Sequence, residues 1–124
     1  MTADFEIYRA ALARELVPAM GCTEPIALAY AAAVAGDRLG GYPEVIDVEV
    51  SRNIVKNVKS VVVPNTGGLN GIEAAVAAGF VVRAPQKSLE ILSGVTDSER
   101  SEIRRRATEP MHVHQSDEPD VFFI

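Results

Sequence analysis

The sequence predicts an α/β (α+β) protein in which alanine-rich central helices pack against a small mixed or antiparallel sheet. Two segments, 25–39 and 69–80, combine helical spacing of apolar residues with many alanines, which let neighbouring elements approach closely. A third segment, 44–51, alternates apolar and polar residues, as a strand with one wet face does. These observations together predict a helical core with strands beside it.

Size and composition limit the class of protein. The 124 residues suit one core, so we expect a single domain over 1–124. Hydrophobic residues form 48% of the chain, which argues against disorder. The net charge of −5 argues against nucleic-acid binding, which usually requires an excess of basic residues. One cysteine cannot form an internal disulfide, and the N-terminal residues lack the apolar core of a signal peptide. We therefore expect a cytoplasmic protein that does not act on nucleic acid or membrane.

The first two predicted helices cover 4–17 and 25–39. The second has Cys22 or Thr23 as its N-cap and a proline in its first turn, where the missing amide hydrogen costs nothing. Gly40 follows its last turn, as is common after a helix. A cysteine therefore stands at the start of a central helix.

The second half of the chain has three further helical segments. Residues 53–62 place apolar side chains at i, i+3, i+4 and i+7, which predicts a helix in spite of many valines. The helix over 69–80 is expected to end near Gly79. A capping box at 96–99 starts a helix to Ala107, whose early acids and late arginines complement the helix dipole.

The end of the chain reads as a hairpin. Residues 110–115 and 121–124 are two β-forming runs around an acidic turn. An apolar run at the very end leads us to expect the N-terminal part of a larger domain, completed by a missing C-terminal domain or by another copy in a homo-oligomer.

The strongest candidate for chemistry is the segment Met20–Pro25, which contains Cys22 and Glu24. A thiol at a helix N-terminus faces unpaired amide hydrogens and the positive end of the dipole, and both favour the thiolate. Glu24 either orients the thiol and moves a proton or only complements the dipole. The sequence leaves open whether Cys22 is a base, a nucleophile or a structural residue.

A second polar loop, 64–68, precedes the helix predicted over 69–80. It offers a side-chain amide, a hydroxyl and flexible backbone amides suited to a carboxylate or phosphate, on Asn65, Thr66, Gly67 and Gly68. No Gly-Lys-Ser/Thr follows, so the loop is not a nucleotide-binding P-loop. Asn57 either extends this polar surface or only solvates its own helix. The alternative for the loop is a purely structural role, as a glycine turn with an Asn cap.

Two histidines, His112 and His114, alternate along the predicted strand over 110–115 and share one face of it. That spacing suits two metal ligands, but no third ligand is evident in the sequence around them. We therefore expect no metal site within this chain.

Three segments in order carry a resemblance to a known family: Gly-Cys-Thr-Glu-Pro at 21–25, the run 51–68 that ends in Pro-Asn-Thr-Gly-Gly, and Gly-Ile-Glu-Ala-Ala at 71–75. From about Ile7 onward the chain resembles the N-terminal part of the L-cysteine desulfidase-like family, also called UPF0597. That family is related to the alpha subunit of iron–sulfur L-serine dehydratase. Arg52 departs from the pattern, which has a glycine there.

The resemblance implies a pyridoxal-independent lyase that eliminates hydrogen sulfide or water from a small L-amino acid such as L-cysteine or L-serine, giving pyruvate and ammonia. It also implies a [4Fe-4S] cluster that acts as a Lewis acid on the leaving group. The cluster's cysteine ligands lie in the later part of the family's chain, so we expect no cofactor within this chain and no activity from it alone.

Carried over to this sequence, the resemblance makes Cys22 a catalytic residue with Glu24 beside it. We assign the substrate carboxylate to Asn57 and to the 64–68 loop through Asn65, Thr66, Gly67 and Gly68. The alternative is a chain without catalysis of its own: a small-ligand-binding or regulatory module, or an accessory chain that completes an enzyme in trans.

Overall fold

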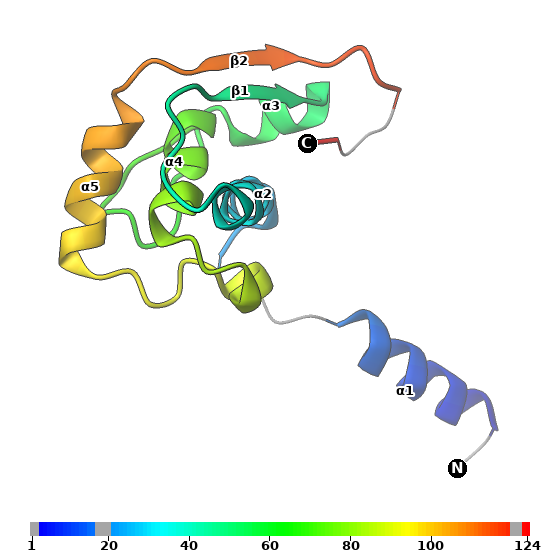
Figure 1. The fold of residues 1–124 in the computed structure, drawn as a ribbon. Helices are drawn as coiled ribbons and strands as arrows, with labels where there is room; N and C mark the ends of the chain where they lie inside the picture. The colour runs from blue at the N-terminus through cyan, green and yellow to red at the C-terminus, as the bar shows by residue number, and fades with distance from the viewer. Residues whose placement is uncertain (1–2, 17–20, 120–122) are drawn as a thin grey trace.

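The computed structural model describes residues 3–16, 21–119 and 123–124. In this part the chain is mostly helical, with one small two-stranded sheet (Figure 1). The elements in order are α1 (Ala3–Glu15), α2 (Thr23–Leu39), β1 (Asp47–Val50), α3 (Arg52–Val58), α4 (Ile72–Val82), the 3-10 helix η1 (Pro85–Glu90), α5 (Asp97–Ala107) and β2 (His112–Gln115). The predicted combination of central helices with a small sheet is confirmed.

The centre of the fold is the pair α2 and α4, which are both rich in alanine and pack on each other. At their crossing, a Cβ added to Gly79 would lie 2.0 Å from the backbone oxygen of Ala29. The prediction that Gly79 caps the helix is therefore wrong, because this glycine lies inside α4 and lets α2 approach. The cap is Arg83, which has a left-handed backbone (φ 51°) and donates its N–H to the Gly79 oxygen at 2.9 Å.

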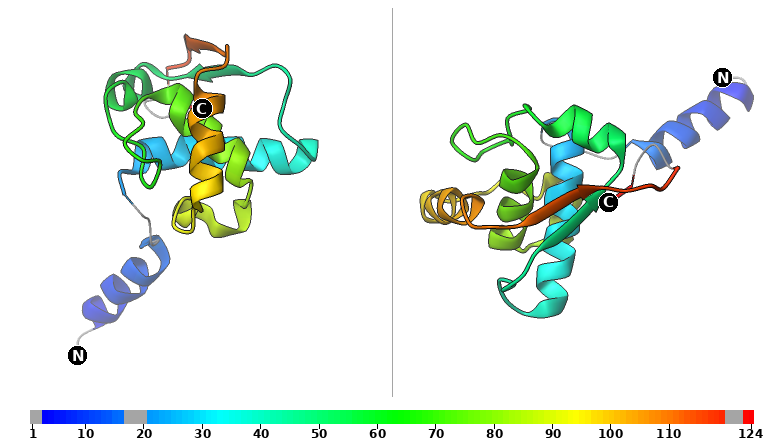
Figure 2. Two further views of the ribbon diagram at one scale, coloured as in Figure 1. Left: turned by 90° about the vertical axis from the view of Figure 1, so that its left-hand side faces the viewer. Right: turned by 90° about the horizontal axis from the view of Figure 1, so that it is seen from above.

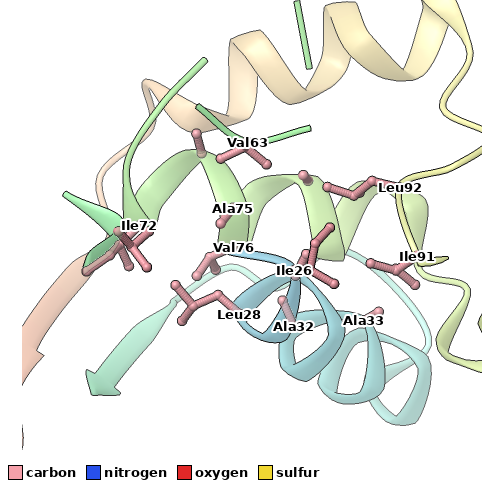
Figure 3. Packing of buried hydrophobic residues seen from close by; sticks show 14 of the residues in the cluster. Ile26, Leu28, Ala32, Ala33, Val63, Ile72, Ala75, Val76, Ile91 and Leu92 are labelled. Carbon is pink, nitrogen blue, oxygen red and sulfur yellow. The ribbon is translucent and has the colours of Figure 1, made fainter. Parts of the chain in front are cut away.

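Aliphatic side chains fill the space around this helix pair (Figure 3). The helix α5 packs on α4, while η1 and α3 pack on α2. The largest fully buried side chains are Ile26, Leu28, Ile54, Ile91, Leu92 and Ile103. The core thus joins helices from both halves of the described chain, and it fixes the loops between them.

The strands β1 and β2 pair in parallel, with Asp47 opposite His112 and Glu49 opposite His114. The predicted mixed or antiparallel sheet is therefore wrong for the described residues, while the predicted hairpin of 110–115 with 121–124 falls partly outside them. Parallel strands need a long crossover, which α3, α4 and α5 supply here. Of the expected last strand, residues 121 and 122 lie outside the described residues, and Phe123 instead accepts a 2.9 Å hydrogen bond from the amide of Ser51.

Several predicted bounds shift by a few residues. The strand expected over 44–51 is confined to β1, and the helix expected over 53–62 ends at Val58. Beyond it, the Val63 amide donates to the Leu69 oxygen at 2.8 Å, and this hydrogen bond closes the polar loop 64–68. The helix predicted over 69–80 therefore begins only at Ile72. The capping box before α5 is confirmed by reciprocal hydrogen bonds between Thr96 and Glu99 at 3.0 and 3.1 Å.

The first helix, α1, extends away from the rest of the described chain (Figures 1 and 2). It buries none of its side chains. Its apolar side chains larger than alanine are all more than half exposed, namely Phe5, Ile7, Tyr8 and Leu12. None of the helices in the described residues is both long and apolar enough to cross a membrane.

Candidate functional site

The start of α2 lies directly against the polar loop 64–68. Gly21 has a left-handed backbone (φ 93°), and a Cβ added to it would lie 2.3 Å from Cγ of Pro64. Only a residue without a side chain fits between this backbone and the proline ring. The two segments that sequence analysis selected for chemistry are therefore neighbours in the structure.

Cys22 and Glu24 face each other across the first turn of α2. Cys22 is exposed and occupies the N-cap position, but its side chain caps no backbone amide. Its Sγ donates instead to Oε2 of Glu24 at 3.4 Å, and the Thr23 hydroxyl donates to the same oxygen at 3.4 Å. The thiol is thus positioned to pass its proton to a carboxylate.

The environment of Glu24 keeps it ionised. Its pKa is lowered first by a hydrogen bond from its own backbone amide, then by the Cys22 thiol, with smaller contributions from the side chains of Thr23 and Asn57. The little burial present acts in the other direction. Asn57 reaches this carboxylate from α3, so a thiol, a carboxylate and an amide from two helices meet. We call Cys22, Glu24 and Asn57 the Cys22 cluster.

The two polar side chains of the 64–68 loop hold the loop in place. Asn65 donates from Nδ2 to the Leu92 oxygen at 2.9 Å, and its Oδ1 accepts from Nη1 of Arg100 at 2.7 Å. Thr66 is buried and donates its hydroxyl to the Val63 oxygen at 2.8 Å. The role of Asn65 and Thr66 in substrate binding stays a prediction, and in this arrangement both side chains serve the protein's own backbone.

The exposed part of the loop is its backbone at Gly67 and Gly68. Both residues have positive φ angles, 76° and 95°. No hydrogen bond within the described part of the chain occupies their amide N–H groups. Turns with amides in such conformations form concave anion sites, so these two N–H groups are the ones available to a carboxylate.

Two arginines of α5 that were not predicted as site residues reach this loop. Arg100 bonds Asn65, and Arg104 donates from Nη2 to the Gly67 oxygen at 3.5 Å. The sequence pattern explains the arginines of this helix only as complements of its dipole. The signal that could have found them is their spacing of four residues, which places both on one face of a helix. Arg104 also lines a hollow of about 420 Å³ beside Gly68, with Glu73 and Thr108 on its wall.

The histidine pair lies elsewhere, on β2. Neither His112 nor His114 belongs to the Cys22 cluster. Asp47 stands across the sheet from them, with Oδ1 3.7 Å from Nδ1 of His112 and 3.2 Å from Nδ1 of His114. The third group that the sequence did not reveal is therefore on the neighbouring strand.

The geometry defines a mostly helical α+β protein with an exposed thiol–carboxylate pair at the start of its central helix. The chain is 49% identical over 121 residues to a UPF0597 protein of Desulfitobacterium hafniense, covering 97% of this chain and 28% of the relative. It is 52% identical to UPF0597 proteins of Treponema denticola, over 92 residues, and of Lachnoclostridium phytofermentans, over 94 residues. These matches cover 74% and 76% of this chain and 21% and 22% of the relatives. No family model and no solved structure matches the chain.

The chain belongs to the UPF0597 family. It spans about a quarter of the length of these curated relatives. The names of these relatives state a family and no activity.

A [4Fe-4S] cluster, which the family resemblance implies, does not fit the residues of this chain. Such a cluster is held by several cysteine thiolates, and the sequence contains only Cys22. Its ligands would have to come from another part of a longer chain.

Proposed function

We propose that this chain contributes the Cys22 cluster and the 64–68 loop to a pyridoxal-independent lyase. The enzyme eliminates hydrogen sulfide or water from a small L-amino acid such as L-cysteine or L-serine and gives pyruvate and ammonia. The observation that carries the proposal is the contact of Gly21 with Pro64, because it brings the segment with the thiol–carboxylate pair against the start of the 64–68 loop. The resemblance to L-cysteine desulfidases supports the same reaction.

The Cys22 cluster supplies the proton chemistry that an elimination needs. Glu24 is ionised and accepts the thiol proton of Cys22, and the thiolate then removes the proton from Cα of the substrate. The Cα–H electron pair forms a double bond to Cβ while the bond to the leaving group breaks. The leaving group takes up the proton that Glu24 received, which returns the thiol and the carboxylate to their starting states. The aminoacrylate product tautomerises, and water hydrolyses it to pyruvate and ammonia.

The 64–68 loop supplies recognition of the substrate carboxylate. The N–H groups of Gly67 and Gly68 point to an anion site, and Arg104 adds a positive charge next to Gly67. Asn57 interacts with the Glu24 carboxylate from α3. Because the Cys22 thiol is exposed, the rest of a longer chain is needed to exclude water from the reaction.

A chimera tests the proposal. The matching part of the Desulfitobacterium hafniense relative is replaced by this chain, and the purified protein is assayed anaerobically for pyruvate and sulfide from L-cysteine and L-serine. We expect turnover by the chimera, none by the isolated chain, and a loss of kcat of at least about 100-fold in Cys22→Ser and Glu24→Gln chimeras. Gln86→Ala, an exposed change on η1, is the matched control.

Two outcomes would contradict the proposal. If neither the parent relative nor the chimera forms pyruvate, the lyase reaction is wrong. If both are active and Cys22→Ser keeps full activity, the lyase stands but the role of the Cys22 cluster is wrong.

The exposed apolar side chains of α1 favour a second candidate, an accessory chain that completes an enzyme in trans. Tyr8 and Leu12 lie about one turn apart on α1 and are 67% and 57% exposed. Mixing this chain with the remaining part of the relative should then give a complex in light scattering and restore pyruvate formation. Self-association of this chain alone would instead favour a homo-oligomer. Binding of L-serine without turnover in any assembly would favour a ligand-binding or regulatory module.

A further inference from the structure

We propose that Asp47, His112 and His114 form a binding site for one divalent transition-metal ion, best suited to Zn²⁺. This site lies on the outer face of the two-stranded sheet and is independent of the lyase proposal. It follows from the parallel pairing of β1 with β2, which brings a carboxylate to the two histidines.

The three side chains present their ligand atoms to one point. One ligand atom from each of Asp47, His112 and His114 lies within 4.8 Å of the other two. The two imidazole rings are 5.1 Å apart between centroids and are inclined at 38°. Zinc binds imidazole nitrogen at about 2.0–2.1 Å and carboxylate oxygen at about 2.0–2.2 Å, so small rotations of exposed side chains close the site.

The state of His114 favours a metal ligand over a simple ion pair. Its Nδ1 is shielded from solvent and has no hydrogen-bond partner, although Oδ1 of Asp47 is only 3.2 Å away. Its other ring nitrogen, Nε2, lies 3.9 Å from Oε2 of Glu49. Histidines that bind metals usually hold their second ring nitrogen against a carboxylate, which orients the ring and raises its basicity. Glu49 is placed for that orienting role.

The donor set determines the class of ion. Two imidazoles and one carboxylate suit Zn²⁺, Co²⁺ or Ni²⁺, whereas Mg²⁺ and Ca²⁺ prefer sites made of oxygen atoms. The side chain of His112 is 75% exposed and that of Asp47 is 61% exposed, so water can complete the coordination. A bound ion would connect β1 to β2 through side chains, in addition to the backbone hydrogen bonds of the sheet.

The test is a titration of the whole chain with zinc. The Cys22→Ser variant serves as the parent, so that the exposed thiol cannot act as a competing ligand. After treatment with a chelator and its removal, isothermal titration with ZnCl2 at neutral pH should give one site. Replacing zinc with CoCl2 should give visible absorption bands of a site with nitrogen and oxygen ligands.

Four variants assign the ligands. His112→Ala, His114→Ala and Asp47→Asn should each weaken zinc binding by about 10-fold or more, and Glu49→Gln should keep one site while weakening it by about 10-fold. Asp37→Asn, which removes a negative charge from the surface of α2, is the matched control and should bind as the parent does. Circular dichroism checks that the variants are folded, and their exposed positions favour that result.

Two results would overturn the site. One is the absence of one-to-one zinc binding to the parent up to the millimolar range. The other is equal binding by the parent and by the double variant His112→Ala/His114→Ala, which would mean that zinc binds elsewhere on the chain.

Discussion

Gly21 and Pro64 contact each other so closely that no side chain fits at Gly21. A Cβ there would come within 2.3 Å of the proline Cγ, at a backbone φ of 93° that disfavours other residues. This contact joins the start of α2 to the loop that precedes α4. It places the residue before Cys22 against the first residue of the 64–68 loop, although more than 40 residues separate them in the sequence.

Gly21→Ala should therefore destabilise the protein by roughly 2–4 kcal/mol, from backbone strain and from the clash with Pro64. Gly40→Ala is the control, because Gly40 has a similar φ of 82° but open space where its Cβ would lie. It should cost only about 1 kcal/mol. Urea denaturation measures both, and equal losses would show that the contact with Pro64 does not matter.

Gly79→Ala should destabilise by roughly 3 kcal/mol or more, because the new methyl group would meet the backbone oxygen of Ala29 at 2.0 Å. An ordinary helix gains about 1 kcal/mol from the same change. At Gly36 the nearest atom is a side-chain carbon of Phe80 at 3.0 Å, which can move. Gly36→Ala should therefore cost far less in the same denaturation assay. A stabilised Gly79→Ala variant would contradict the close crossing of α2 and α4.

Asn65 and Arg100 should show an energetic coupling of about 1–2 kcal/mol, since a charged donor bonds a half-buried amide oxygen at 2.7 Å. Arg100→Met also loses contacts to Val95 and Asp97, so single variants are not sufficient. A double-mutant cycle with Asn65→Ala removes these other effects. Additive losses in urea denaturation would mean that the hydrogen bond from Arg100 to Asn65 does not help to hold the 64–68 loop.

The Glu24 carboxyl should titrate below its usual value of 4.5 in the folded protein. A pKa lowered by folding stabilises the native state fully above the unfolded value and loses that contribution as pH falls through the folded value. The stability difference between the wild type and Glu24→Gln should therefore shrink below about pH 4.5. Carbon NMR of the carboxyl should also show its pKa rising in Cys22→Ala. An unchanged pKa in that variant would contradict the thiol–carboxylate hydrogen bond.

Local sequence signals predicted the helices well. The capping box at 96–99 and the span of α2 both depend on residues a few positions apart. The sheet failed because its pairing depends on residues far apart: His112 lies opposite Asp47, after three intervening α-helices. The spacing of apolar residues predicted α1 as a helix, but periodicity cannot say whether anything covers its apolar side.

In the candidate site, too, only the features that depend on residues close together in the sequence could be predicted. The proximity of Cys22 and Glu24 follows from their spacing on one helix turn, and in the structure the thiol donates a hydrogen bond to the carboxylate. The side chain of Asn65 bonds Arg100 across 35 positions, so its inward orientation had no local signal. Asp47 reaches the histidine pair through the pairing of β1 with β2, and no local sequence signal connects these two strands.

The crossing of α2 and α4 determines how the start of α2 lies relative to the loop before α4. Ala29 lies about seven residues from Cys22, and Gly79 about seven from the start of α4, so each arm is roughly 10 Å long. A rotation of about 10° at the crossing would move the ends of the arms by almost 2 Å, and shifts of that size can cost an enzyme about 100-fold in rate. Gly79 therefore sets how the two segments of the proposed site lie relative to each other, and directed evolution of the chimera would find its activity sensitive to this position, which touches no substrate.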